Sequence, residues 1–183
     1  MTLKGTALSS TLGAIEHVHG ASGLAAVRAA LPTAVRRLID DEPILAVRWY
    51  PVEIVAALHV AVRDVVGHGD WSASHALGMA AAREDFKNLY RIVIRALTPT
   101  TVWSRMERMW TLYNSRGKFT WIERKPGSVH VIIRDVAGYN PGMWNAVAGR
   151  GQQVILMTGA KAANVAVVRS TESEGEFEGL WFE

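Results

Sequence analysis

The chain has 183 residues, of which 49% are hydrophobic and 20% are charged, and its formal net charge is +3. This composition supplies enough apolar side chains for a buried core and argues against a largely disordered chain. The chain contains no cysteine, which excludes disulfides, thiolate metal sites, iron–sulfur clusters and cysteine nucleophiles.

The segment from Met1 to Thr6 has no apolar signal core followed by a small-residue cleavage site. Further along the chain, no uninterrupted apolar run reaches the length needed to span a bilayer. We therefore expect a soluble, unexported protein of the cytoplasm without a membrane span.

Helices are predicted for most of the first 117 residues. Breaks at Gly20 and Pro32 predict two helices, over residues 8–19 and 22–31. A third, short helix is predicted over residues 33–39.

The next helix is predicted to have Pro51 in its first turn, because the first helical turn does not use the N–H that proline lacks. Apolar residues recur at helical spacing until Gly67 ends this helix. Asp70 or Ser72 can cap a further helix, which we expect to continue to about Leu97. Its apolar stripe contains Phe86, Leu89, Tyr90, Val93 and Leu97.

A last helix in this half is predicted to begin with Thr98 as N-cap and Pro99 in the first turn. Gly117 is its predicted C-cap. Its apolar face contains Val102, Met106, Met109, Trp110 and Tyr113.

The pattern changes at Lys118, where apolar and polar residues begin to alternate as in a strand. Two such runs on either side of the Pro126-Gly127 turn predict a β-hairpin. A helix is predicted over residues 143–157, followed by strands over residues 162–170 and 176–182.

A run of helices followed by elements in β-β-α-β-β order argues for an α+β fold rather than a doubly wound parallel sheet. We expect an N-terminal layer of four to five helices packed on a four-stranded antiparallel sheet. The length suits one domain, so we expect a single domain over residues 1–183, with a helical part (1–117) and a sheet part (118–183).

Short segments along most of the chain are similar to those of one protein family. They are Lys4-Gly5-Thr6, Leu31-Pro32, Trp49-Tyr50-Pro51, Gly69-Asp70, Leu77-Gly78, Arg83-Glu84-Asp85-Phe86, Tyr90-Arg91, Thr98-Pro99, Trp110, Tyr113 and Gly117. This pattern resembles a paralogous family of unknown function found in myxobacteria. That family is distantly similar to the superfamily of the 4-vinyl reductase domain, haem nitric-oxide-binding domains and Bet-three-type vesicle-tethering subunits. The resemblance implies a helical layer against an antiparallel sheet, often with a small apolar ligand enclosed.

The chain departs from that superfamily at the residues that hold its cofactors. Zinc-binding members of the 4-vinyl reductase group use cysteines, and this chain has none. Haem-binding members carry a Tyr-x-Ser-x-Arg signature, whereas Tyr113-Asn-Ser115-Arg116 is one residue short of it. We therefore expect no metal and no cofactor.

Seven tryptophans are present, and most of them fall on predicted apolar faces. Core packing explains most of these positions, but rigid aromatic area and methionine also line ligand pockets. The preferred candidates for lining a pocket are Trp49, Tyr50, Met106, Trp110 and Trp144.

Four basic residues, Arg83, Lys87, Arg91 and Arg95, are spaced four apart and so share one helical stripe. Such a stripe could face phosphates, an acidic partner or the five glutamates within residues 171–183. The alternative is an ordinary solvated helix face.

His68, Asp70 and His75 could converge on a metal ion or a polar ligand. The alternative is a turn between two helices in which Asp70 is the cap. This second interpretation is favoured because the spacing matches no standard metal-binding motif.

No nucleophile motif, phosphate loop or carboxylate pair of a known catalytic type is found. The sequence therefore favours a non-enzymatic sensory or interaction module that holds a small apolar ligand between helices and sheet. One alternative is a homodimeric protein–protein adaptor without ligand, whose last strand could pair edge to edge with a partner. A less favoured alternative is a nucleic-acid-binding protein that uses the basic stripe.

Overall fold

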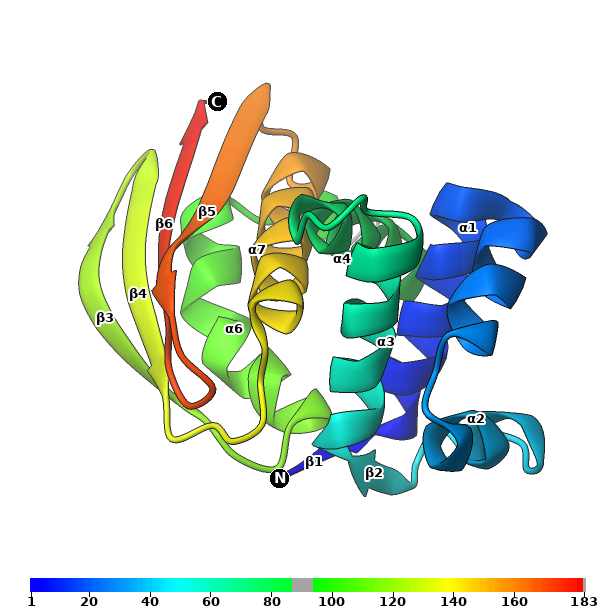
Figure 1. Ribbon diagram of the computed structural model, residues 1–183. Helices are drawn as coiled ribbons and strands as arrows, with labels where there is room; N and C mark the ends of the chain where they lie inside the picture. Colours follow the sequence, from blue (N-terminus) through cyan, green and yellow to red (C-terminus); the bar gives the residue numbers. More distant parts are fainter. Residues whose placement is uncertain (87–93, 183) are drawn as a thin grey trace.

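A layer of helices packs against one face of a four-stranded antiparallel sheet in the computed structural model of this chain, which describes residues 1–86 and 94–182 (Figure 1). The α+β class and the β-β-α-β-β order of the second part are confirmed. The described helices are α1 (Gly5–Ala29), α2 (Thr33–Asp40), α3 (Val52–Val65), α4 (Ser72–Asp85), α6 (Pro99–Tyr113) and α7 (Pro141–Met157).

Helix α1 joins the two helices that the sequence predicts on either side of Gly20. This glycine has a φ of 73°, in the left-handed region, so the helix kinks there and then continues. Helix α2 begins directly after Pro32, as predicted.

Helix α4 is shorter than predicted. It begins at Ser72, whose backbone N–H and hydroxyl donate to the Asp70 carboxylate at 2.9 and 2.6 Å. It ends at Asp85, because Phe86 leaves helical geometry with φ −109° and ψ 32°. The predicted continuous helix to about Leu97 is therefore wrong. Three members of its predicted stripe, Leu89, Tyr90 and Val93, lie outside the described residues.

Helices α6 and α7 both begin with a side-chain cap followed by proline. The Thr98 hydroxyl accepts a hydrogen bond from Thr101 N at 3.2 Å, as predicted. The Asn140 side chain accepts one from Met143 N at 3.0 Å. These bonds satisfy N–H groups that a helix start otherwise leaves unpaired.

Gly117 is not the C-cap of α6, so that prediction is wrong. The helix ends at Tyr113, and Asn114 is already extended. Gly117 has a φ of 122° and lies against the Trp110 indole, where a Cβ would be 2.3 Å from Nε1. Its role is therefore to admit this close approach.

The sheet has the strand order β3-β4-β6-β5. Its strands are β3 (Lys118–Lys125), β4 (Ser128–Arg134), β5 (Ala162–Ser170) and β6 (Gly175–Phe182), which confirms all four predicted strands. Strand β6 pairs with β4 on one side and with β5 on the other. The prediction that the last strand could pair edge to edge is therefore wrong, because both of its edges are occupied within the chain.

A two-stranded ribbon, which the sequence did not predict, lies beside the start of α3 (Figure 1). It pairs β1 (Thr2–Lys4) with β2 (Trp49–Pro51), and Leu3 is opposite Tyr50. Strands of three residues are too short to show an alternating pattern.

Glycines let α4 and α7 approach backbone to backbone. A Cβ on Gly78 would lie 2.1 Å from the Ala146 carbonyl oxygen, and a Cβ on Gly149 would lie 2.1 Å from that of His75.

Within residues 1–86 and 94–182, no helix combines the length and apolarity needed to cross a membrane.

Candidate functional site

A pocket of about 140 Å³ lies between the helices and the inner face of the sheet. We call it the interlayer pocket. It is lined by side chains of α1, α3, α6, α7 and all four strands, together with Asp85 at the end of α4, and most of the lining is apolar. Its contacts include Val55, Met106, Met109, Trp110, Phe119, Val131, Ile133, Met143, Ala148 and Phe177.

Trp110 forms the centre of an aromatic wall beside this pocket. Its ring centroid lies 5.9 Å from Phe119, 5.8 Å from Tyr139 and 6.4 Å from Trp144. The Trp110 indole N–H donates to the Arg116 carbonyl at 2.7 Å, and that of Trp144 donates to the Thr171 carbonyl at 2.7 Å. These bonds fix both rings, so the wall is rigid.

Arg150 and Asp85 form an ion pair at the edge of the pocket. Their side chains are 27% and 18% exposed. Arg150 also donates to the Ser10 hydroxyl at 2.9 Å. These contacts join α7, α4 and α1 through one guanidinium group, and the paired charges sum to zero.

His59 is a buried polar group in the otherwise apolar lining contributed by α3. It is 2% exposed, and its Nδ1 lies 2.9 Å from the Ser74 hydroxyl. Burial, with repulsion from Arg150 as the second cause, lowers the pKa of His59 from 6.5 to about 4. The imidazole is therefore neutral at pH 7. No described residue forms a hydrogen bond with its Nε2.

Tyr139 and Asn114 complete the polar lining. The Tyr139 hydroxyl donates to the Asn114 side chain at 2.7 Å. Burial raises the pKa of Tyr139 far above its ordinary value of 10. The phenol therefore stays protonated at any ordinary pH.

The five residues predicted to line a pocket separate into three places. Met106 and Trp110 line the interlayer pocket. Trp144 lies behind Trp110, with the two rings stacked at an interplanar angle of 9°. Trp49 and Tyr50 belong to the β1–β2 ribbon, where Trp49 is 40% exposed.

Sequence reasoning missed His59 and Arg150 as pocket residues. One signal was available for His59, because it is a lone polar side chain between the apolar residues Leu58 and Val60 of a strongly apolar helix. No signal marked Arg150, whose partners on α1 and α4 come from distant parts of the chain.

The predicted basic stripe is only partly described. Arg83 Nε donates to Gln153 Oε1 at 2.8 Å, and Arg95 is exposed. Lys87 and Arg91 lie outside the described residues.

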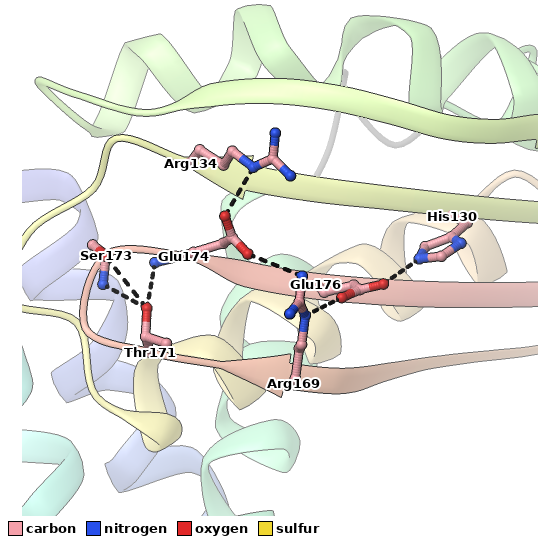
Figure 2. Close-up of polar contacts among 7 residues, drawn as sticks. All are labelled: His130, Arg134, Arg169, Thr171, Ser173, Glu174 and Glu176. Carbon is pink, nitrogen blue, oxygen red and sulfur yellow. Dashed lines mark hydrogen bonds and ion pairs between the residues drawn. The ribbon is translucent and has the colours of Figure 1, made fainter.

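Two of the five glutamates near the end of the chain, Glu174 and Glu176, pair with the sheet's own basic residues, as Figure 2 shows. Glu176 contacts His130 Nε2 at 2.7 Å and also pairs with Arg169. Glu174 accepts from Arg134 Nε at 2.8 Å. The hydrogen bonds from His130 and Arg169 lower the pKa of Glu176. These acidic groups are therefore partly neutralised within the sheet.

Asp70 and His75 have separate partners, and His68 lies in the turn before α4 with a left-handed φ of 52°. Asp70 binds Ser72, and His75 Nε2 lies 3.2 Å from the Val165 carbonyl oxygen. In the described part of the chain, no three His, Asp or Glu side chains are grouped as a metal site would require.

No protein-family model matches the chain, and no curated protein matches it. Solved H-NOX structures do match. An unliganded Fe(II) H-NOX protein from K. algicida has a TM-score of 0.69 and 13% identity, with 98% of this chain and 97% of that chain covered. An oxygen-binding H-NOX domain related to soluble guanylate cyclases, in its oxygen complex, has a TM-score of 0.68 and 11% identity, with 98% of this chain and 95% of that chain covered.

A mutant of the T. tengcongensis H-NOX protein has a TM-score of 0.68 and 9% identity, with 98% of both chains covered. At these identities the likeness shows the fold alone. The chain therefore has the H-NOX fold.

Haem distortion has been probed in H-NOX proteins of this fold, so the fold implies a haem. The residues that the structure describes do not fit one. The pocket volume of about 140 Å³ is close to that of an engineered cavity that takes up benzene, and a porphyrin is far larger. Tyr139 stays protonated, so it offers no phenolate ligand for iron. Arg150 is the one cation among the described lining residues, and it is already paired with Asp85 rather than free to bind a haem carboxylate.

Proposed function

We propose that this protein is a non-enzymatic sensory module that binds a small apolar molecule in the interlayer pocket. The observation that carries the proposal is the pocket itself, an apolar space between the helical layer and the sheet with a fixed aromatic wall. Apolar pockets with a few convergent polar groups are the usual form of small-molecule sites.

The volume favours a ligand about the size of one aromatic ring. An engineered apolar cavity of about 150 Å³ stays dry and binds benzene, and the interlayer pocket measures about 140 Å³. Contact with Met106, Trp110 and Phe177 supplies apolar surface for such a molecule.

A sensory role follows from how the pocket joins the surrounding elements. Arg150 holds α1 and α4 against α7 at the pocket edge. A ligand that binds more tightly to one arrangement of these helices shifts the population toward it. The H-NOX neighbours, one of them an oxygen-binding domain, support a sensory rather than a catalytic use of the fold.

Two finer assignments belong to this proposal. One is membership of the myxobacterial paralogous family, which rests on the short segments that resemble it. The other is a cytoplasmic location.

The proposal is tested by isothermal titration calorimetry with toluene. Ala148 is 1% exposed and lines the pocket, so Ala148→Leu fills the space that a ligand needs. Ala14 is also 1% exposed but does not line the pocket, so Ala14→Leu is the matched control. We expect toluene to bind the unmodified chain and the control, and not Ala148→Leu.

Thermal unfolding separates the two variants further. Ala14→Leu overpacks a filled core, and we expect it to lower the free energy of unfolding by about 1–3 kcal/mol. The leucine of Ala148→Leu extends into open space, so this variant is expected to lower it less. Equal toluene affinity in Ala148→Leu and the unmodified chain would overturn the proposed site.

A further inference from the structure

His59 supplies the interlayer pocket with a hydrogen-bond donor. Its side chain is 2% exposed and lines the pocket, yet only Nδ1 has a partner among the described residues, the Ser74 hydroxyl at 2.9 Å. His59 Nε2 is not among the unpaired nitrogens that are sealed within the described protein, so a molecule in the pocket can reach it. A polar nitrogen beside an apolar pocket is costly to leave without a hydrogen bond, and a ligand can supply one.

The position of the ring hydrogen follows from the bonds of Ser74. The Ser74 hydroxyl is fully buried and contacts no described acceptor other than His59 Nδ1. If Nδ1 carried the hydrogen, the hydroxyl hydrogen would also be left without an acceptor. We therefore assign the hydroxyl as donor to Nδ1, which leaves the ring hydrogen on Nε2.

The charges around the pocket argue for a neutral ligand. Arg150 is already compensated by Asp85, and the lowered pKa keeps His59 uncharged at pH 7. An added carboxylate would be a buried charge without a partner, which is strongly unfavourable.

Resting on the function proposed above, we infer that the ligand is a neutral molecule of about one ring whose oxygen atom accepts a hydrogen bond from His59 Nε2. A carbonyl compound has this chemistry, because its oxygen accepts and it brings no donor of its own that would need a partner.

The test compares benzaldehyde with styrene, which have nearly the same shape and differ in C=O against C=CH₂. The quantity measured by calorimetry is the ratio of the styrene and benzaldehyde dissociation constants within each variant. Because it is a ratio, a general loss of stability affects both terms alike.

His59→Phe removes the donor. We expect the ratio of the styrene to the benzaldehyde dissociation constant to fall about five- to tenfold, which corresponds to the loss of one hydrogen bond. His59→Asn keeps an N–H donor and is expected to restore part of the preference. Trp181→Phe is the control, because Trp181 is also 2% exposed and its N–H has no partner among the described residues, but it does not line the pocket. Its ratio is expected to stay unchanged.

Benzoate at pH 7 tests the charge argument, and we expect it to bind at least about a hundredfold more weakly than benzaldehyde. A ratio that is unchanged in His59→Phe, or that falls equally in Trp181→Phe, would overturn the role of His59. Equal affinity for benzoate would overturn the neutral ligand. If neither benzaldehyde nor styrene binds the unmodified chain, the proposed function fails as well.

A second measurement does not depend on how His59→Phe folds. In ¹⁵N NMR of the unmodified chain, we expect the hydrogen of the His59 ring on Nε2, and its resonance should move with benzaldehyde and not with styrene. A hydrogen on Nδ1, or no response to benzaldehyde, would overturn the inference.

Discussion

The contact between α4 and α7 predicts that adding one methyl group at Gly149 destabilises the fold. The new Cβ would lie 2.1 Å from the His75 carbonyl oxygen and 3.1 Å from Met79 N, while ordinary contact begins at 3.4 Å. These are backbone atoms, so the two helices must separate by about 1 Å.

The expected size follows from two opposed effects. Overpacking costs up to about 3 kcal/mol, and alanine recovers up to about 1 kcal/mol of helix propensity. The net loss of about 2 kcal/mol lowers the Tm of a chain of this length by roughly 4–8 °C. Gly13 offers a matched control, because a Cβ added there would have no atom within 4 Å. Gly13→Ala should therefore raise the Tm by roughly 1–4 °C.

Thermal unfolding followed by far-UV circular dichroism measures both changes. A Tm of Gly149→Ala at or above that of the unmodified chain would refute the inferred backbone contact. For Gly13→Ala, a Tm above that of the unmodified chain is expected. The Tm values of the two variants must therefore shift in opposite directions.

Two further predictions concern polar groups. His59 has a pKa of about 4 when folded and 6.5 in the reference state, so the unfolded chain takes up its proton first. Stability should fall by up to about 3 kcal/mol between pH 6.5 and 4. Urea unfolding should show that His59→Phe lacks this loss. Asn140→Ala removes the bonds to Met143 N and the Ala56 carbonyl and should cost about 1–2 kcal/mol in the same assay. Asn145→Ala, at an exposed amide, should cost less.

Local patterns were sufficient for most of the fold. The hairpin of β3 and β4 was visible because alternating side chains and the Pro126-Gly127 turn act over a few residues. The end of α4 was not visible, because it is tied to α7 by Arg83–Gln153 and Asp85–Arg150, contacts 70 and 65 residues apart along the chain. No periodic pattern reports such contacts.

The pocket was predictable only where one helix face contributes several residues to it. Met106 and Trp110 belong to the apolar face of α6, and both lie in the lining of the interlayer pocket. His59 lines the pocket because α3 packs beside α4 and α7, and the neutral state of its ring depends on that burial. Trp49 and Tyr50 shared the composition of pocket residues, but the β1–β2 pairing holds them elsewhere.

The central claim is that a small molecule occupies the interlayer pocket, and diffraction from crystals soaked in bromobenzene tests it most directly. The bromine atom gives an anomalous signal that locates the ligand without reference to any assumed pose. We predict a peak against Met106 and Trp110 in the unmodified chain and none in crystals of Ala148→Leu. Bromine peaks confined to the outer surface of the protein, or an equal peak in Ala148→Leu, would contradict the account.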